Sequence, residues 1–273
     1  MNSNLSINRI NSINSYNNKY TGLKSNNPSF THHFSKNDLS ARQKAVILTT
    51  STLGMAPVLA VLAKRKGFSL SPKRLLKTPI KDWAIFKSQP KERSIQFKAP
   101  QIMAVAAGSV AGGFVGGAIV DKKANRKAKQ REILNQILGN VAVPVACVST
   151  GAHFYDKYAN KIESIMPQLK GEKKSIKILN KILKSVPNAV TTLGLLGIGI
   201  YLGNKVSNFI NEKIYNKKVE RNIKASDFAP HVDDLCMAMT VMNEDSLFAS
   251  RLARVIPLAL LVPGYQTGIA QEH

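Results

Sequence analysis

The chain contains very little cysteine, acid and aromatic residue. Among 273 residues there are two cysteines, one tryptophan and 16 acidic residues. Cys147 and Cys236 cannot build a disulfide framework, and no C-x-x-C pair offers zinc or redox spacing. The phosphate loop G-x-x-x-x-G-K-[ST], the dinucleotide motif G-x-G-x-x-G, H-E-x-x-H and G-x-S-x-G are all missing. These absences exclude the commonest nucleotide-binding, metalloprotease and hydrolase signatures, so we expect neither enzymatic activity nor a cofactor.

Charge is missing from five long blocks, although the whole chain is strongly basic. Lys and Arg number 39 against 16 Asp and Glu, which gives a net charge of +23. Basic linkers separate the uncharged blocks at residues 45–63, 101–120, 133–152, 186–203 and 255–270. A helix of about 20 apolar residues spans a hydrocarbon core about 30 Å thick. The first four blocks meet or approach that length, whereas prolines and a glycine interrupt the fifth.

Glycine is concentrated in the second block, "MAVAAGSVAGGFVGGAIV". In a water-exposed helix each glycine costs about 1 kcal/mol relative to alanine. In lipid, by contrast, helices need small residues to approach one another, because lipid tails are as apolar as leucine. A glycine recurs at every fourth position of this block, which resembles the glycine zippers of membrane segments, and Gly113 and Gly117 widen the same face. The fourth block repeats the spacing. We therefore predict helix-packing positions at Gly108, Gly112, Gly116, Gly199 and Gly203.

Residues 1–40 differ in composition from the rest of the chain. Asn and Ser dominate, and the first acidic residue is Asp38. So few large apolar residues cannot offset the entropy lost on ordering, so we predict a disordered tail at 1–40 and a helical membrane domain at 41–273. The tail lacks the apolar core of a secretory signal peptide. We expect the bacterial cytoplasmic membrane, with an organelle membrane as the alternative.

Basic residues flank the apolar blocks, as in "KRKG" after the first and "DKKANRKAKQRE" after the second. Such collars suit anionic headgroups, because Lys and Arg stems extend toward the membrane interface. Nucleic acid is the competing explanation of the net charge, but lysine outnumbers arginine and aromatic residues make up only 7%. We therefore expect a lipid bilayer with anionic headgroups as partner, together with self-association or another membrane protein, and not nucleic acid.

Two linkers have their apolar residues at helical spacing. The linker at 156–185 predicts two amphipathic helices, broken near Pro167 and Gly171 and lying on the membrane surface. The region 228–254 predicts a second amphipathic pair. This region also contains the soft or imidazole ligand types that Cu(I) prefers, at His231, Cys236, Met239 and Met242. Because the cysteine and these methionines share one helix face with apolar neighbours, we interpret them as a packing stripe and assign no metal site.

The predicted fold class is all-α, an integral membrane protein with four or five apolar helices. Its preferred function is structural, in assembly or membrane organisation, through glycine-faced helices and basic interfacial segments. A small transporter or channel is the first alternative. An approximate repeat, "ILNQIL" at 133–138 and "ILNKIL" at 178–183, favours it, whereas blocks without charge disfavour it because transport paths carry buried ionisable groups. A soluble basic helical protein that binds acidic partners or nucleic acid is the second alternative.

Overall fold

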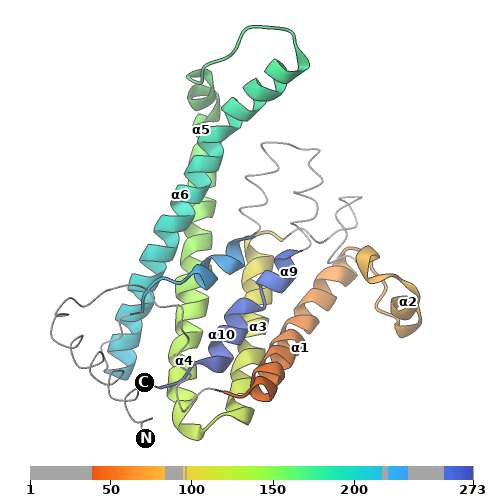
Figure 1. Ribbon diagram of the computed structural model, residues 1–273, viewed down its shortest axis with the longest axis vertical. Helices are drawn as coiled ribbons and strands as arrows, with labels where there is room; N and C mark the ends of the chain where they lie inside the picture. Colours follow the sequence, from red (N-terminus) through yellow and green to blue (C-terminus); the bar gives the residue numbers. More distant parts are fainter. Residues whose placement is uncertain (1–38, 84–94, 96, 217–220, 233–254, 273) are drawn as a thin grey trace, which may run out of the picture. The chain divides into compact units, whose positions relative to one another are not determined.

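The computed structural model describes residues 39–83, 95, 97–216, 221–232 and 255–272, and all regular structure within these ranges is helical. The predicted all-α fold is therefore confirmed for the described residues (Figure 1). Four helices are long and apolar enough to cross a membrane, namely Ala41–Arg65, Ala99–Val120, Lys123–Ser164 and Lys174–Tyr215. Each of the first four predicted blocks lies within one of them. The predicted tail lies outside the described residues, apart from its last two positions.

The first apolar block forms α1 (Ala41–Arg65), and its start is set by a capping box. Ser40 Oγ accepts a hydrogen bond from the Gln43 backbone N–H at 3.3 Å, and Gln43 Oε1 accepts one from the Ser40 N–H at 2.9 Å. This reciprocal pair satisfies two backbone donors that a helix start leaves open. The Gln43 side chain also donates to the carbonyl of Val120 at 2.6 Å, which ties this end of α1 to the end of α3.

Four consecutive hydroxyl residues, 49–52, lie inside α1. Each side-chain oxygen donates to the carbonyl four residues earlier, at 2.8 to 3.1 Å. Ser and Thr inside a helix can donate to the carbonyl four residues earlier, and a hydroxyl bonded in this way does not need water as a partner. The polar run in the first block is therefore compatible with apolar surroundings.

Helix α3 (Ala99–Val120) packs between two others. It runs antiparallel to α1, since Gly108 lies against Gly54 and Gly116 against Ile47. On another side it contacts α10 (Val262–Ile269), which follows the short helix α9 (Ile256–Ala259). The interrupted fifth block thus packs against the second block as two short helices.

The third block belongs to a 42-residue helical stretch, Lys123–Ser164, assembled from several pieces. It begins with the turn η3 (Lys123–Asn125) and α4 (Arg126–Leu134). A π-helical segment, η4 (Asn135–Ala142), follows and leads into α5 (Val143–Ser164). Segments of π-helix are rare and occur often at functional sites. At 1.5 Å per residue the whole stretch is roughly 63 Å long, about twice the thickness of a hydrocarbon core.

Helix α6 (Lys174–Tyr215) pairs with α5 as a long hairpin (Figure 1). The break between them contains Pro167 and Gly171, as expected. However, the expected separate surface helices of the 156–185 linker do not form, because α5 and α6 continue through their amphipathic parts without interruption. No proline or glycine lies between residue 152 and Ser164 to end α5 earlier. Asn216, in the left-handed conformation at φ 50°, ends α6.

Three shorter elements complete the described chain, namely α2 (Pro72–Lys77), η1 (Ile80–Asp82) and η5 (Ala225–His231). The predicted amphipathic pair at 228–254 lies outside the described residues beyond Val232. The same is true of Cys236 and of both methionines in the proposed stripe.

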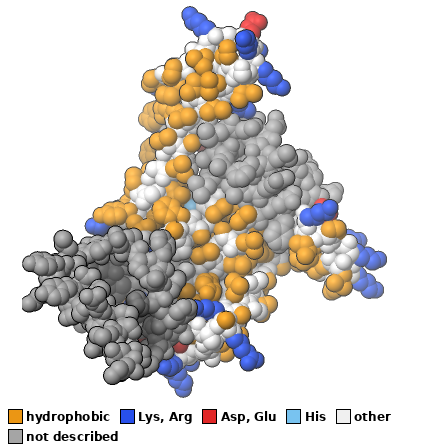
Figure 2. All heavy atoms as spheres, in the orientation of Figure 1, with side chains coloured by type: hydrophobic (Ala, Val, Ile, Leu, Met, Phe, Trp, Pro, Cys, Tyr) orange, Lys and Arg blue, Asp and Glu red, His pale blue; other side chains and the backbone are white. Residues whose placement is uncertain are grey.

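Side chains are distributed in an unusual way between surface and interior. Large apolar residues of the long helices are exposed, for example Leu53 at 64%, Ile119 at 70% and Val190 at 63%. Figure 2 shows apolar side chains over much of the described face, with Lys and Arg near its edges. The interior instead holds many small or polar residues, including Ser51, Ser109, Asn135, Gln136, Asn140, Asn204, Ser207, Asn211 and Asp227. In water-soluble proteins, large apolar side chains are usually buried, and Ser, Asn, Gln and Asp are usually exposed.

Candidate functional site

The predicted glycines of the second block lie against α1. A methyl group added to Gly108 would come 2.7 Å from the carbonyl oxygen of Gly54. One added to Gly112 would overlap the carbonyl of Thr50, and one added to Gly116 would overlap the hydroxyl of the same threonine. Real Cβ atoms do not approach backbone this closely. The two helices therefore contact each other through main chain, which only glycine permits here.

Gly113 and Gly117 face a different helix. A Cβ on Gly113 would lie 2.9 Å from the Cα of Gly264, and one on Gly117 would lie 2.9 Å from the Cα of Gly268. Instead of widening the face toward α1, as the sequence predicts, these two glycines contact α10. Consecutive helical residues are separated by about 100°, so a glycine pair exposes backbone on two sides. Helix α3 thus has one glycine face toward α1 and a second toward α10.

Gly199 and Gly203 lie at a separate contact, between α6 and the η4–α5 segment. A Cβ on Gly199 would lie 2.6 Å from the Cα of Pro144. One on Gly203 would lie 2.9 Å from the Cα of Gly139. The five predicted positions are therefore divided between two helix contacts and do not form one site.

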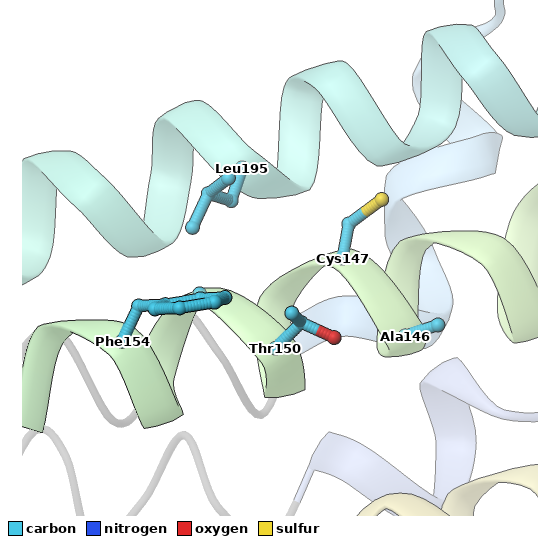
Figure 3. A pocket seen from close by; sticks show the side chains of 6 residues that line it. Ala146, Cys147, Thr150, Phe154 and Leu195 are labelled. Atoms are coloured by element: carbon cyan, nitrogen blue, oxygen red, sulfur yellow. The ribbon is translucent and has the colours of Figure 1, made fainter.

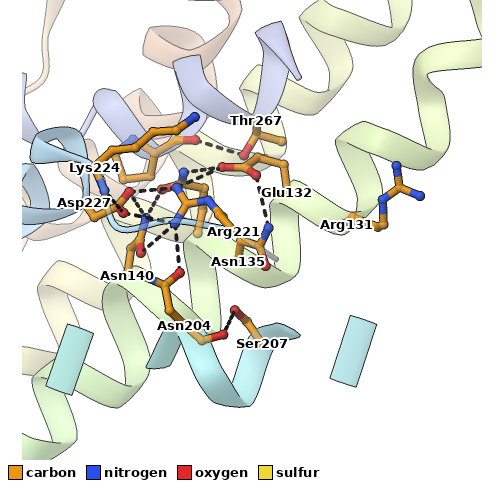
Figure 4. A network of polar contacts seen from close by, with 12 residues as sticks. Arg131, Glu132, Asn135, Asn140, Asn204, Ser207, Arg221, Lys224, Asp227 and Thr267 are labelled. Atoms are coloured by element: carbon orange, nitrogen blue, oxygen red, sulfur yellow. Dashed lines mark hydrogen bonds and ion pairs between the residues drawn. The ribbon is translucent and has the colours of Figure 1, made fainter. Parts of the chain in front are cut away.

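A buried polar network lies beside the second of these contacts, with Arg221 at its centre (Figure 4). The Arg221 guanidinium donates to Asp227 at 2.7 Å through Nη2 and to the Asn204 side-chain oxygen at 3.0 Å through Nη1. It also lies 3.4 Å from a carboxylate oxygen of Glu132. The side chain of Arg221 is 8% exposed and that of Asp227 is 0% exposed. Charges buried to this degree are stable only when paired and hydrogen-bonded.

Three residues spaced four apart along α4 and η4 form one wall of the network. Gln136 donates to Glu132 at 2.6 Å, and Asn140 donates to Gln136 at 3.0 Å. Asn140 also donates to Asp227 at 2.8 Å. This row of amides extends from Glu132 along one helix face, and through Asn140 it attaches the 3-10 helix η5 to η4.

Two further bonds hold η5 in place. The Lys224 backbone N–H donates to Asp227 at 2.8 Å. The buried His231 donates from Nε2 to the backbone carbonyl of Asn140 at 2.8 Å. Because a carbonyl oxygen can only accept a hydrogen bond, this contact assigns the ring proton of His231 to Nε2.

The η4 wall of the network contacts α3. Val141, next to Asn140, belongs to the same apolar cluster as Val105 and Ala106 of α3. If the long helices cross a bilayer, Arg221 and Asp227 lie at membrane depth. Ionisable groups at such depth are expensive and usually functional. Irregular backbone there requires partners within the protein.

A second ionic contact joins the end of α10 to the turn after α3. Lys129 is fully buried, and its ammonium donates to Asp121 at 2.8 Å and to the carbonyls of Gly268 and Ala270 at 2.7 and 2.8 Å. These acceptors satisfy all three ammonium protons. Burial by itself would raise the pKa of Asp121. The hydrogen bonds from Lys129, a neighbouring asparagine and a backbone N–H, together with the lysine charge, nevertheless hold that pKa below its usual value of 3.8.

An open apolar hollow of about 380 Å³ lies between α5 and α6 (Figure 3). It is lined by Ala146, Cys147, Thr150, Gly151, Phe154 and Leu195. The lining contains one hydroxyl, of Thr150, and one thiol, of Cys147, and no acidic or basic side chain. Within the described ranges, no group of three or more His, Cys, Asp or Glu side chains is arranged to hold a metal ion.

The sequence analysis did not find the Arg221 network. Asn135, Gln136 and Asn140 were visible as polar positions in the third block, and their spacing from Glu132 indicates one polar helix face. Nothing in the linker pattern connected Arg221 and Asp227 with that face, because the contact spans roughly 90 residues of chain.

Comparison of the chain with protein-family models, curated proteins and solved structures finds no match.

Proposed function

We propose that the chain is an integral membrane protein with a structural or assembly role, organising a membrane or docking other membrane segments through its glycine-faced helices. The distribution of side chains carries this proposal. The long helices expose large apolar residues and bury glycine, serine and asparagine. In lipid, outward apolar residues need no cover, and helix association depends on close packing and internal polar contacts.

Two details of α1 support membrane insertion. Its hydroxyl residues at 49–52 bond to their own helix and need no water. Its last turn contains Lys64 and Arg65, at the point where an apolar span would meet anionic headgroups. The bacterial cytoplasmic membrane is the proposed location.

The Arg221 network supports a structural role over transport. The two carboxylate oxygens of Asp227 accept hydrogen bonds from Arg221, Asn140 and the Lys224 backbone, all within the protein. Groups bonded in this way hold residues 221–224 and the 3-10 helix η5 against η4. Buried polar groups of this kind can specify one arrangement of packed elements even where they add little net stability.

Membrane fractionation tests the proposal directly. We expect the full chain to remain in the pellet after high-speed centrifugation in alkaline carbonate and to enter solution only with detergent. A detergent-free sample that stays in the supernatant, monodisperse and without affinity for vesicles, would contradict membrane insertion and favour the soluble basic protein.

A transporter or channel is the second candidate, and one observation favours it. Arg221, Asp227 and Glu132 form an ionic cluster beside a π-helical segment. Proton and ion paths use buried ionisable groups and interrupted helices. Solute or proton flux in reconstituted liposomes that is lost in Asp227→Asn would select this candidate over the structural one. Tight vesicles without flux would retain the structural role.

A further inference from the structure

The end of α1 turns the chain sharply aside. Gly67 has a φ of +75°, its N–H donates to the carbonyl of Lys64 at 2.9 Å, and the next N–H, of Phe68, donates to the carbonyl of Ala63 at 3.0 Å. These bonds make a Schellman motif, which ends a helix and redirects the backbone. The Phe68 side chain packs back against the cluster that contains Ala63. The residues after Phe68 therefore begin beside the last turn of α1 and do not continue along its axis.

Residues 69–83 are held by local bonds and contribute no buried side chain. Thr78 Oγ1 donates to the carbonyl of Arg74 at 2.7 Å, and Trp83 Nε1 donates to the carbonyl of Thr78 at 3.1 Å. Leu76 is 89% exposed and Ile80 is 65% exposed. The segment is thus ordered by its own contacts, with Leu76 and Ile80 directed away from the protein.

The charge of this region is almost entirely positive. Between residues 64 and 83 there are seven Lys or Arg and one acid, Asp82. The exposed basic side chains of the segment are Lys73, Arg74, Lys77 and Lys81. Exposed apolar side chains among lysines and arginines complement a surface whose outer layer is negatively charged and whose inner layer is apolar. An anionic bilayer surface has that structure, and each nearby Lys or Arg contributes about 1 kcal/mol to its attraction.

We propose that residues 69–83 bind the surface of an anionic lipid bilayer, with Leu76 and Ile80 in the headgroup region and the basic side chains against the lipid phosphates. The proposal rests on the proposed function, since the membrane interface lies at the end of α1 only if α1 spans. The lipid-binding proposal extends that function by naming the segment that binds the anionic headgroups.

Trp83 is the only tryptophan of the chain, so its fluorescence reports on this segment alone. The full chain would be reconstituted in nanodiscs of phosphatidylcholine with increasing phosphatidylglycerol, part of the phosphatidylcholine carrying bromine near the top of its acyl chains. We expect phosphatidylglycerol to increase quenching of Trp83 by bromine and to decrease quenching by aqueous acrylamide. Bromine near the methyl ends of the lipid acyl chains should quench Trp83 fluorescence less.

Two sets of variants test separately the contributions of the basic side chains and of the apolar side chains to lipid binding. Combined K73Q, R74Q, K77Q and K81Q should raise the phosphatidylglycerol fraction needed for half-maximal quenching by about twofold or more. Combined L76D and I80D should reduce bromine quenching at every lipid composition. The matched control, K122Q, K123Q, R126Q and K127Q, removes the same charge from the exposed turn after α3 and should leave Trp83 unchanged.

The outcomes distinguish this proposal from the one on which it rests. A protein that inserts in nanodiscs but whose Trp83 stays open to acrylamide at every lipid composition overturns the lipid-binding segment and leaves the membrane protein intact. Protection of Trp83 only in native membranes would assign the segment to a protein partner and also overturn it. Failure of the chain to enter bilayers at all overturns both proposals.

Discussion

Helix α3 contacts both α1 and α10 through backbone, whereas α5 and α6 contact each other largely through side chains. In the three-helix unit, a methyl added to Gly108 or Gly113 would meet main-chain atoms of the neighbouring helix. In the hairpin, a methyl added to Gly151 would meet the end of the Leu195 side chain. A methyl added to Gly194 of α6 would meet no atom of the described residues within 4 Å, apart from its own helical turn. The first unit is therefore rigidly specified, and most of the hairpin can adjust.

The base of the hairpin is an exception. There Gly203 lies against Gly139, and the Arg221 network crosses from η5 to α6 and η4. The hairpin is thus fixed at one end by backbone contact and buried charge, and it becomes more adaptable toward the connection between α5 and α6. Substitutions along the chain should reveal this gradient.

The largest effect is expected when the network at the hairpin base loses a charge. Asp227→Asn leaves the Arg221 guanidinium buried without its closest counter-charge, which should lower the free energy of unfolding by about 3–5 kcal/mol. Reversible unfolding in mixed detergent micelles measures it. The control is Arg131→Gln at the partly exposed pair with Glu272, where the expected loss is below about 1 kcal/mol. Equal losses in the two variants would show that the network does not hold the hairpin base.

The second prediction compares the change in stability caused by one added methyl group in α3 with that caused by one in α6. Gly113→Ala should destabilise the three-helix unit by about 1–3 kcal/mol, because the backbone of α10 cannot retreat without losing its other contacts. Gly194→Ala should leave stability unchanged or raise it by up to about 1 kcal/mol, since alanine favours helix. The same unfolding measurement serves both. If Gly194→Ala were the more damaging variant, the contrast between the regions would be wrong.

A smaller effect is expected inside the hairpin itself. Gly151→Ala presses on the end of the Leu195 side chain, which can change rotamer, so the loss should stay below about 1 kcal/mol. Leu195→Ala in the same chain should recover that loss. A double-mutant cycle measures the coupling, and a loss that Leu195→Ala does not relieve would mean that the backbones of α5 and α6 are closer than side-chain contact requires.

The smallest effect comes from lowering the pH rather than from a substitution, and it concerns the pair of Asp121 and Lys129. The folded-state pKa of Asp121 is lowered below 3.8. Its contribution is therefore present above the unfolded value and is lost as the pH falls through the lower folded value. Melting temperature measured from pH 7 down to pH 2.5 should fall more steeply in the natural chain than in Asp121→Asn. Parallel curves would show that the pair does not stabilise the end of α10.

Much of the helical layout could be predicted from the sequence. The absence of charge over 45–63 and 101–120 indicated α1 and α3, whose described bounds exceed the blocks by a few residues. The extension of α5 and α6 through their lysine-rich parts was not predicted, because a change from apolar to amphipathic composition does not end a helix. Proline, glycine or a cap does so, and the first of these after block three is Pro167.

The arrangement at the glycines was only partly predictable. Spacing indicated that Gly108 and Gly112 need a close neighbour, but spacing cannot say which helix supplies it. The second face of α3 remained hidden because its partner, α10, begins more than 140 residues later and looks too short and interrupted to matter.

Local composition by itself determined that the described chain is helical, that its blocks prefer apolar surroundings and that the glycines of the second block need a close neighbour, because these properties depend on residues within a few turns. The tertiary structure alone decided that α3 lies between two helices, and that Arg221 meets Asp227, Asn204 and Glu132. Such contacts depend on which distant segments share a small volume. A buried charge is stable only when the folded chain brings its partners there, and no periodicity along the sequence records that condition.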